Sequence, residues 1–439
     1  MSSIFNSKAK LTVLVAGLLL VAAAALYHQL LTGSYHFSGP DSLSPKAVGT
    51  GLRALEAESG EMPTWMPWVF SGLPTVHSFT SVSALYMPYL ITKPLVGLGM
   101  PGFWVFLLHL IFGGLGTYVL VRRLGGTFAA GLLSGSGFML MPYTNTMIVH
   151  GHGSQMMTLV YLPWVIWALV RLYEDRNLIS TAWLTLLVGL MLQRGHVQIA
   201  YYALMLAGLM ALVMIVRLYR DADRGMTEAG KFTGTFALAM LLAFSLAAAL
   251  FIPAMEYTPY SIRGAQAGGG VGFDYATQWS FSLGESLTFI APSFYGFGGV
   301  TYWGNMPFTD YPNYMGLLLL GLAIWAVYRR RDWLTLTLAS ASIIAFLVSL
   351  GHNFFLYRLL YNILPFFNKF RVPVMILVIP QFSVAVLAGL GLDDLLKYME
   401  ARKPDEVRQF IIRLSIGVLG GGILLMVASA MLAGNFPPS

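Results

Sequence analysis

Long apolar runs recur along the whole chain, and they limit what it can fold into more than any other feature. A helix needs about 20 mostly apolar residues to cross a bilayer. Only 10% of the residues are charged and 57% are hydrophobic, whereas soluble proteins carry about 25% charged residues. The sequence therefore predicts an all-α polytopic membrane protein in which residues 1–439 form a single transmembrane domain. We expect about eleven transmembrane helices, at 11–31, 102–121, 126–144, 156–173, 178–193, 198–217, 231–252, 313–328, 333–350, 373–396 and 409–432.

Two long connections separate some of these runs. Residues 32–100 form a large first outer loop, and its last part, 81–100, contains prolines and a lysine that favour a juxtamembrane piece over a crossing. Residues 253–312 form a second large outer loop. The N-terminal run begins like a signal peptide but has no clean cleavage site, so we interpret it as a retained helix. The chain ends in GNFPPS directly after the last run, which fits a short protein and a shortened one equally.

The basic residues give the orientation. With the N-terminus in the cytoplasm, the short inner segments hold 18 of the 26 Lys and Arg residues, including Arg122–Arg123 and Arg329–Arg331. Lys and Arg, not net charge, mark the cytoplasmic side of a membrane protein. A full crossing at 81–100 would reverse every later loop. The expected arrangement is a multi-pass protein of a bacterial cytoplasmic (inner) membrane, with its polar clusters on the extracytoplasmic face.

Composition also excludes several functions. The net charge of +7 is explained by this membrane topology, so we expect no nucleic-acid partner. The chain has no cysteine, which excludes disulfides, thiol catalysis and cysteine-ligated metals. No nucleotide-binding glycine motif follows a strand pattern. We expect no cofactor that the sequence makes certain and no metal site.

Asp41 is the carboxylate of most interest, because it lies about ten residues beyond the first span in a polar, aromatic stretch. A carboxylate at a membrane-proximal outer site can act as a general base toward a hydroxyl. It can also bind a divalent cation through oxygen, and that reading stays open. The alternative is a solvated turn residue, since the residues around Asp41 are good turn formers.

Histidines gather at two outer span ends. His150, His152 and Gln155 belong to the stretch HGHGSQ, and Arg194 and His196 lie at the equivalent outer end two spans later. Such side chains suit an anionic or hydroxyl-rich ligand. Two histidines two residues apart do not share a helical face, so they do not form a helical zinc pair. The alternative is that these groups satisfy helix ends at the interface.

Aromatic stretches in the two loops suit a sugar or lipid. Residues 63–74 contain Trp65 and Trp68 and are interpreted as an interfacial helix at the mouth of a site, or as ordinary headgroup anchors. The second loop contains Arg263, Glu285, Tyr302 and Trp303. Aromatic faces with carboxylates and amides are typical of carbohydrate sites, and also of interfacial packing.

Lys369 and Arg371 open a span from the outer side in the stretch NKFRVP. A guanidinium and a helix N-terminus together favour phosphate. The alternative is simple attraction to lipid headgroups. Arg371 stands closer to the apolar run and is the better candidate to point inward.

Several motifs in combination resemble the YfhO family of bacterial membrane proteins. They are WMPWVFSGLPT, GHGSQMMTLVYLPWV, GHVQIAYY, YSIRG, TYWGNMPFTD and NKFRVPVMILV, in order from about residue 40 to 395. The resemblance implies a GT-C-like glycosyltransferase with a polyprenyl-phosphate sugar donor, an acidic residue in the first loop and a cell-envelope acceptor such as a teichoic acid. It matches Asp41 to that acidic position, and Arg371 and Lys369 to the basic motif. Three departures stand out: the chain is short, the first loop has a single Asp, and Trp65-Met66-Pro67 replaces Trp-Asn-Pro.

The hypothesis is a membrane glycosyltransferase that moves a sugar from a polyprenyl-phosphate lipid to a cell-envelope glycan or polymer. Asp41 is the expected general base, and Arg371, Lys369 and Arg194 are the expected contacts of the donor phosphate. Sugar or acceptor contacts are expected from His150, His152, Gln155, His196, Arg263, Glu285, Tyr302 and Trp303. The alternative is a transporter, or a lipid-handling or scaffold protein without bond chemistry. Transporters tend to place charge near the bilayer midplane, whereas polarity here gathers at one face.

Overall fold

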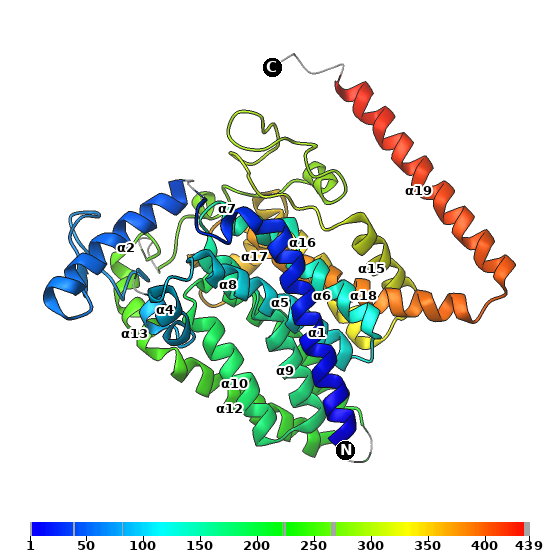
Figure 1. Cartoon of the computed structure of the whole chain (residues 1–439), viewed down its shortest axis with the longest axis horizontal. Coiled ribbons are helices and arrows are strands. Elements are labelled where there is room, and N and C mark those ends of the chain that lie inside the picture. The colour runs from blue at the N-terminus through cyan, green and yellow to red at the C-terminus, as the bar shows by residue number, and fades with distance from the viewer. Residues whose placement is uncertain are drawn as a thin grey trace.

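A computed structural model describes residues 2–37, 40–80, 82–221, 223, 225–264 and 269–433. The C-terminal stretch GNFPPS therefore lies outside the described residues. Helices dominate the described chain, and the only strands in it form one short hairpin. Figure 1 shows a bundle of helices, with α2 projecting to one side and α19 standing apart at the other.

Six segments of the described chain are long and apolar enough to cross a membrane, judged by length and composition. They are Ala9–Leu30, Phe103–Arg123, Gly153–Asp175, Val197–Tyr219, Gly225–Leu246 and Pro373–Glu400. Their helices are α1 (Ser2–Tyr27) with η1 (His28–Leu30), α5 (Phe103–Arg123), α8 (Gly153–Leu159) with α9 (Leu162–Asp175), α11 (Val197–Tyr219), α12 (Gly225–Leu246), and η6 (Pro373–Leu377) with α18 (Val378–Glu400). The protein is thus a nearly all-α chain with the makeup of a helical membrane protein.

The remaining expected spans take other forms. Shorter apolar helices are α10 (Leu178–Gln193), α15 (Leu317–Arg329) and α16 (Trp333–Ser349). The run 126–144 is not one helix, because it divides into α6 (Phe128–Met139) and α7 (Pro142–Val149). Proline at the first position of α7 has no backbone N–H to continue α6. The run 231–252 begins earlier, in α12, and is followed by α13 (Ala248–Tyr257), while 409–432 lies within α19 (Pro404–Ala433).

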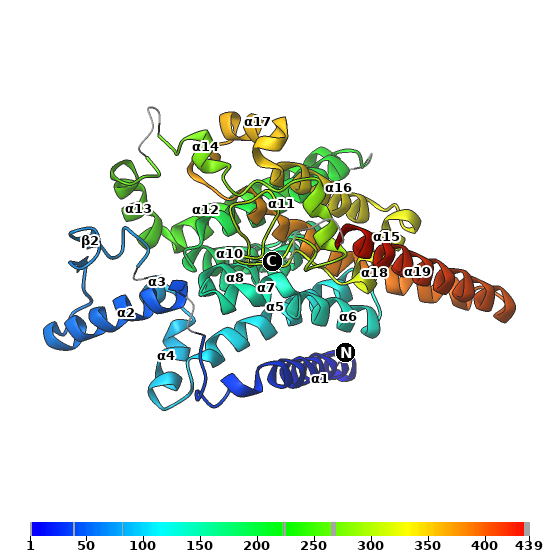
Figure 2. The same ribbon diagram turned by 90° about the horizontal axis from the view of Figure 1, so that it is seen from above.

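The centre of the bundle is α18. Of its most apolar window, 94% of the residues are buried, whereas the corresponding figure for α1 is 17%. A helix that is apolar on all sides is expected at a core position. It packs against α15, α6 and α16, and Figure 2 shows it inside the bundle with α1 along an edge. Elsewhere, α5 and α6 approach closely, since a β-carbon on Gly135 would lie 2.6 Å from the Gly114 carbonyl oxygen. Small residues permit such contacts in membrane bundles.

The first loop contains more regular structure than its composition predicts. Its elements are α2 (Pro40–Ser59), β1 (Trp65–Met66), β2 (Leu73–Pro74), α3 (Val82–Leu85) and α4 (Tyr89–Gly97). The expected interfacial helix around Trp65 is wrong, because β1 and β2 pair antiparallel there. Prolines at 63, 67 and 74 oppose a helix, and Phe70, Ser71 and Gly72 turn the chain with positive φ. The nine-residue α4 is too short to cross a bilayer.

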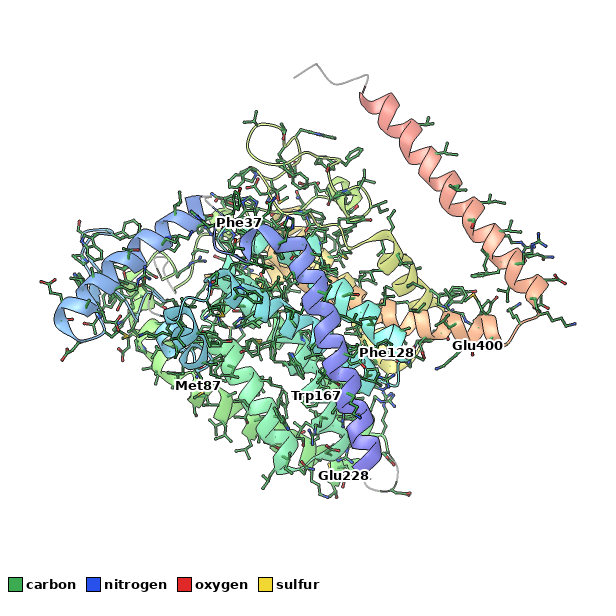
Figure 3. All side chains as sticks on the ribbon, viewed as in Figure 1. Phe37, Met87, Phe128, Trp167, Glu228 and Glu400 are labelled. Carbon is green, nitrogen blue, oxygen red and sulfur yellow. The ribbon has the colours of Figure 1, made fainter. Side chains whose placement is uncertain are left out.

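The second loop forms a cap at one end of the bundle. It includes η2 (Thr258–Tyr260), α14 (Phe273–Ala276) and η3 (Gly284–Phe289), and it meets η4 (Gly351–Asn353), α17 (Phe355–Ile363) and η5 (Phe367–Lys369). A small core around Phe281, Met306 and Leu377 holds part of it. Phe37 labels this end in Figure 3, and Glu228 labels the opposite end. The polar residues of interest lie at the Phe37 end.

Candidate functional site

Asp41 lies in the first turn of α2, and not in an open turn as its neighbours suggested. A carboxylate there is favoured by the positive end of the helix dipole. The loop between α7 and α8 meets it through Gly151, which has φ +84°; a β-carbon on this glycine would lie 2.4 Å from the Asp41 carbonyl carbon and 2.5 Å from the Ser42 nitrogen. Only glycine permits this approach of two backbones. The next residue, His152, is thereby brought to Asp41.

The carboxylate and the imidazole are in direct contact. Nε2 of His152 lies 3.2 Å from Oδ2 of Asp41. On its other side, Nδ1 of His152 hydrogen-bonds the Tyr311 hydroxyl, and the two rings stack with centroids 5.9 Å apart. With Nε2–H donating to the carboxylate, Nδ1 accepts the tyrosine proton. Asp41, His152 and Tyr311 thus form a continuous hydrogen-bonded chain, which we call the acid–imidazole chain.

The side chains of the acid–imidazole chain differ in their exposure to solvent. The Asp41 side chain is 67% exposed and that of His152 is 34% exposed. Burial lowers the pKa of His152, the Asp41 carboxylate acts in the opposite direction, and His150 adds to the lowering. The imidazole is therefore held in its neutral form near pH 7. The outcome is an accessible carboxylate whose inner oxygen is fixed by a neutral donor.

A second histidine–carboxylate pair adjoins the first. Nδ1 of His150 lies 3.9 Å from Oδ2 of Asp310, and the His150 ring lies 6.0 Å from that of Tyr311. The ring of Tyr143 also packs against the ring of Tyr311, with centroids 5.0 Å apart. The segment Asp310–Tyr311 of the second loop therefore closes over the histidine loop.

His196 precedes α11 and caps it, because its Nδ1 accepts a hydrogen bond from the backbone N–H of Ile199 at 3.3 Å. Burial, with smaller contributions from the nearby His152 and Arg263, lowers the pKa of His196 to about 4. His196 therefore lies near both His152 of the acid–imidazole chain and Arg263 of the second loop.

Three basic residues lie near one another here, and we call them the basic cluster: Arg263, Lys369 and Arg371, of which Lys369 meets Arg263 through its main chain. Nη1 of Arg263 donates to the Lys369 carbonyl oxygen at 2.6 Å. Nη1 of Arg371 donates to the Tyr275 hydroxyl at 3.0 Å, and its guanidinium lies 5.8 Å from the Trp279 ring centroid.

No carboxylate of the described residues forms an ion pair with any of these cations. Burial lowers the pKa of Arg263, Tyr275 opposes this, and Arg371 reinforces it. Unpaired cations that lie together in a half-buried place are suited to an anionic ligand. Gln198 supports the cluster, since its Nε2 donates to the Arg371 carbonyl oxygen at 2.6 Å.

The other predicted site residues make contacts of their own, and of these Gln155 adjoins the site, because its backbone N–H donates to the His152 carbonyl oxygen at 3.0 Å. Glu285 is 1% exposed and bonds the Tyr302 hydroxyl and the Ser282 N–H, and Trp303 packs on Tyr295. These contacts are internal to the second loop, so they explain its packing. Gln155 is buried on α8, and Arg194 is buried beside Tyr86. No hydrogen bond or ion pair among the described residues joins Glu285 or Tyr302 to Asp41.

Sequence reasoning missed Tyr311, Asp310 and Tyr275. The first two end the stretch TYWGNMPFTDY, in which Tyr302 and Trp303 are the predicted sugar or acceptor contacts. Within the described ranges, no group of three or more His, Asp or Glu side chains gathers in a way that could hold a metal ion.

Comparison with known proteins adds no relative to this picture. No protein-family model matches the chain, and no curated protein matches it either.

Proposed function

We propose that the protein is a GT-C-type glycosyltransferase that transfers a sugar from a polyprenyl-phosphate donor to a cell-envelope glycan or polymer. The observation that carries the proposal is an exposed carboxylate, Asp41, at the end of the bundle that also holds a basic cluster without a carboxylate partner. His196 is close enough to His152 and to Arg263 for both to lower its pKa. The proposed location is the bacterial inner membrane, with about eleven crossings, a cytoplasmic N-terminus and this end of the bundle extracytoplasmic.

The proposed reaction needs a base at one side of the sugar and positive charge at the other. Asp41 takes the proton of the acceptor hydroxyl as its oxygen bonds to the anomeric carbon. The bond from that carbon to the phosphate oxygen breaks, and the phosphate leaves with the electron pair. Arg263, Lys369 and Arg371 offset its growing charge. Attack opposite to the leaving group inverts the anomeric centre.

His152 has a positioning role in this scheme. Its Nε2–H holds one oxygen of Asp41, which leaves the second oxygen for the acceptor. Tyr311 fixes the imidazole tautomer from the other side. Since burial keeps His152 neutral, the imidazole does not neutralise Asp41 by forming a strong ion pair with it.

The test is transfer by membranes that carry the full chain. Radiolabelled polyprenyl-phosphate monosaccharides are offered as a panel, with cell-envelope acceptors, to wild-type membranes and to membranes with Asp41→Asn. We expect transfer with one donor and a loss of about 100-fold or more in the variant, because general-base catalysis contributes about 10²–10⁴-fold. Asp274→Asn, which changes an exposed acid of the second loop, is the matched control. Wild-type rates in Asp41→Asn would remove Asp41 from the mechanism.

A complete absence of transfer by the wild type across the panel would favour the alternative without bond chemistry, a transporter or a lipid-handling protein. Binding of the donor lipid without turnover would then identify the lipid-handling case.

A further inference from the structure

Arg194 is a buried cation without an anionic partner. It follows α10 at the helix C-terminus, and only 7% of its surface is exposed. Its Nε has no hydrogen-bond partner, and no ion pair among the described residues includes it. An arginine side chain stays protonated in proteins. The charge is therefore present, and nothing in the described chain neutralises it.

The polar groups around Arg194 are neutral, and they donate their protons to hydrogen bonds with one another or with the backbone. The guanidinium lies 4.6 Å from the centroid of the Tyr86 ring. Nδ1 of His109 bonds the Val105 carbonyl oxygen at 2.6 Å, so this nitrogen carries the proton. Nε2 of His109 then accepts from the Tyr86 hydroxyl at 2.8 Å. The Tyr86 oxygen in turn accepts from Tyr161 at 2.5 Å.

These neighbours offset the charge only in part. A cation–π contact and the negative end of a helix dipole each stabilise a nearby positive charge only modestly. Removing an unpaired ion from water costs more than these contacts return. An anion at Arg194 would balance this charge, and the unpartnered Nε indicates where it would bind. In a guanidinium, Nε–H and one Nη–H point the same way and match two oxygens of one oxyanion.

This place is separate from the basic cluster. The neighbours whose charges act on Arg194 are Tyr86 and Tyr161, whereas those that act on Arg263 are Tyr275 and Arg371. The segment over Arg194 belongs to the first loop, and it is fixed there because the Met87 N–H donates to Oε1 of Gln193 at 3.1 Å. Met87 is labelled in Figure 3.

The surface beside this place is apolar. On and just after α4, Leu90 is 74% exposed, Ile91 is 71% exposed and Leu98 is 86% exposed. A short helix with such side chains is suited to contact with acyl chains. An oxyanion next to an apolar surface is what the headgroup of a phosphate lipid presents.

We propose that Arg194 and Tyr86 form a second phosphate-binding site, which holds the headgroup of an anionic lipid whose chains lie along α4. The site is independent of sugar transfer and stands whether or not the proposed reaction is correct. Its ligand clamps the segment between α3 and α4 to the end of α10.

The experiment measures ligand-dependent thermal stability of the purified full chain in a phosphate-free sugar detergent. The probes are dioleoyl phosphatidic acid, dioleoylglycerol as the phosphate-free lipid, and inorganic phosphate. All variants carry Arg371→Gln, which weakens the basic cluster. We expect phosphatidic acid to raise the melting temperature and dioleoylglycerol to leave it unchanged. Adding Arg194→Gln is expected to weaken the response to phosphatidic acid about tenfold or more, because a charge-assisted bond is lost.

Two further variants make the result decisive. Arg358→Gln removes another arginine that lies over an aromatic ring, 3.9 Å from the Phe273 centroid, and it is expected to keep the response. Arg194→Lys keeps the charge without the guanidinium fork and is expected to weaken the response even if the glutamine variant does not fold.

An unchanged response in both Arg194 variants would overturn the site and make Arg194 a packing residue. An equal response to inorganic phosphate would overturn the lipid as ligand while supporting an oxyanion site. Asp41→Asn is expected to leave the response unchanged, so failure of the transfer proposal and failure of this one are distinguishable.

Discussion

Gly151 has no side chain, and the peptide between Asp41 and Ser42 occupies the space that a β-carbon would need. Gly151→Ala is therefore expected to move Asp41 away from His152. A misplacement of about 1 Å costs about 100-fold in rate, so we expect transfer to fall by that order. The measurement is the donor-panel assay at matched amounts of inserted protein.

Gly125→Ala is the matched control for that substitution. Gly125 also has positive φ, +88°, but a β-carbon there would meet nothing within 4 Å. Both alanines cost about 1–2 kcal/mol of backbone strain, while only the change at Gly151 is expected to reduce transfer. An equal loss in both variants would attribute the effect to strain and not to the position of Asp41.

His196 is expected to make the folding stability of the protein depend on pH. Burial lowers its pKa to about 4 in the folded protein, below the value of about 6.5 expected in the unfolded chain. The unfolded state therefore binds more protons between these values, so the stability that depends on neutral His196 is present above pH 6.5 and is lost as pH falls toward 4. Protonation also removes the acceptor that caps Ile199.

We expect the wild-type melting temperature to fall over this window more steeply than that of His196→Asn, because asparagine caps a helix without titrating. The measurement is melting of the full chain in detergent from pH 7.5 to pH 4. Parallel curves for the two proteins would show that His196 carries none of the acid sensitivity.

At the scale of elements, α2 depends on a contact with the hairpin of β1 and β2. A β-carbon on Gly51 would lie 2.7 Å from Cη2 of Trp68, whereas one on Gly49 would only touch Arg53 at 3.5 Å. Gly51→Val is expected to push Trp68 away and to expose residues 60–75 to proteolysis. Gly49→Ala is expected to stabilise α2 by up to about 1 kcal/mol. Limited proteolysis and mass mapping distinguish the two, and equal cleavage would contradict the contact.

Element prediction succeeded where periodicity and length are strong. The apolar runs at 102–121 and 198–217 match α5 and α11 closely, and 373–396 lies within η6 and α18. The run 126–144 is interrupted because Pro142 cannot continue α6 and begins α7 instead. A prediction based on apolar content alone does not detect such a break. Helix α2 was not expected, since its glycines and prolines favour turns and its side chains are largely exposed. Two contacts that are distant in sequence reach it, from Trp68 to Gly51 and from Gly151 to Asp41.

Prediction of the site from the sequence fails for the same reason, because its contacts join residues that are distant in sequence. Asp41 and the HGHG stretch could be singled out from residue type and position alone. Their contact depends on Gly151 and on Tyr311, which lies 159 residues from His152, and one sequence does not reveal such a pairing. Glu285 has the chemistry of a ligand-binding residue, but its carboxylate is used by Tyr302 inside the second loop.

At the scale of the whole molecule, the proposal requires one orientation of the bundle. The chain has no cysteine, so a single introduced cysteine reports its own position. Lys46 and Leu283 are exposed at the end that holds Asp41, and Asp221 and Lys403 are exposed in segments expected to be cytoplasmic. We expect Lys46→Cys and Leu283→Cys to react with an impermeant maleimide on intact cells.

Asp221→Cys and Lys403→Cys are expected to react only after the cells are permeabilised. Labelling of Lys46→Cys and Asp221→Cys from the same side would contradict the orientation. This labelling tests the orientation of the bundle, and the donor-panel assay tests whether the protein transfers sugar.

The docking of α2 through its main chain has a consequence for how such a protein can diversify. A glycine meets the peptide group at the start of the helix, so the proposed base is positioned there by main-chain contact. In the proposed reaction, the exposed positions farther along α2 could then change to select different acceptors while Asp41 keeps its geometry. Under that proposal, acceptor choice and chemistry could evolve separately within one scaffold.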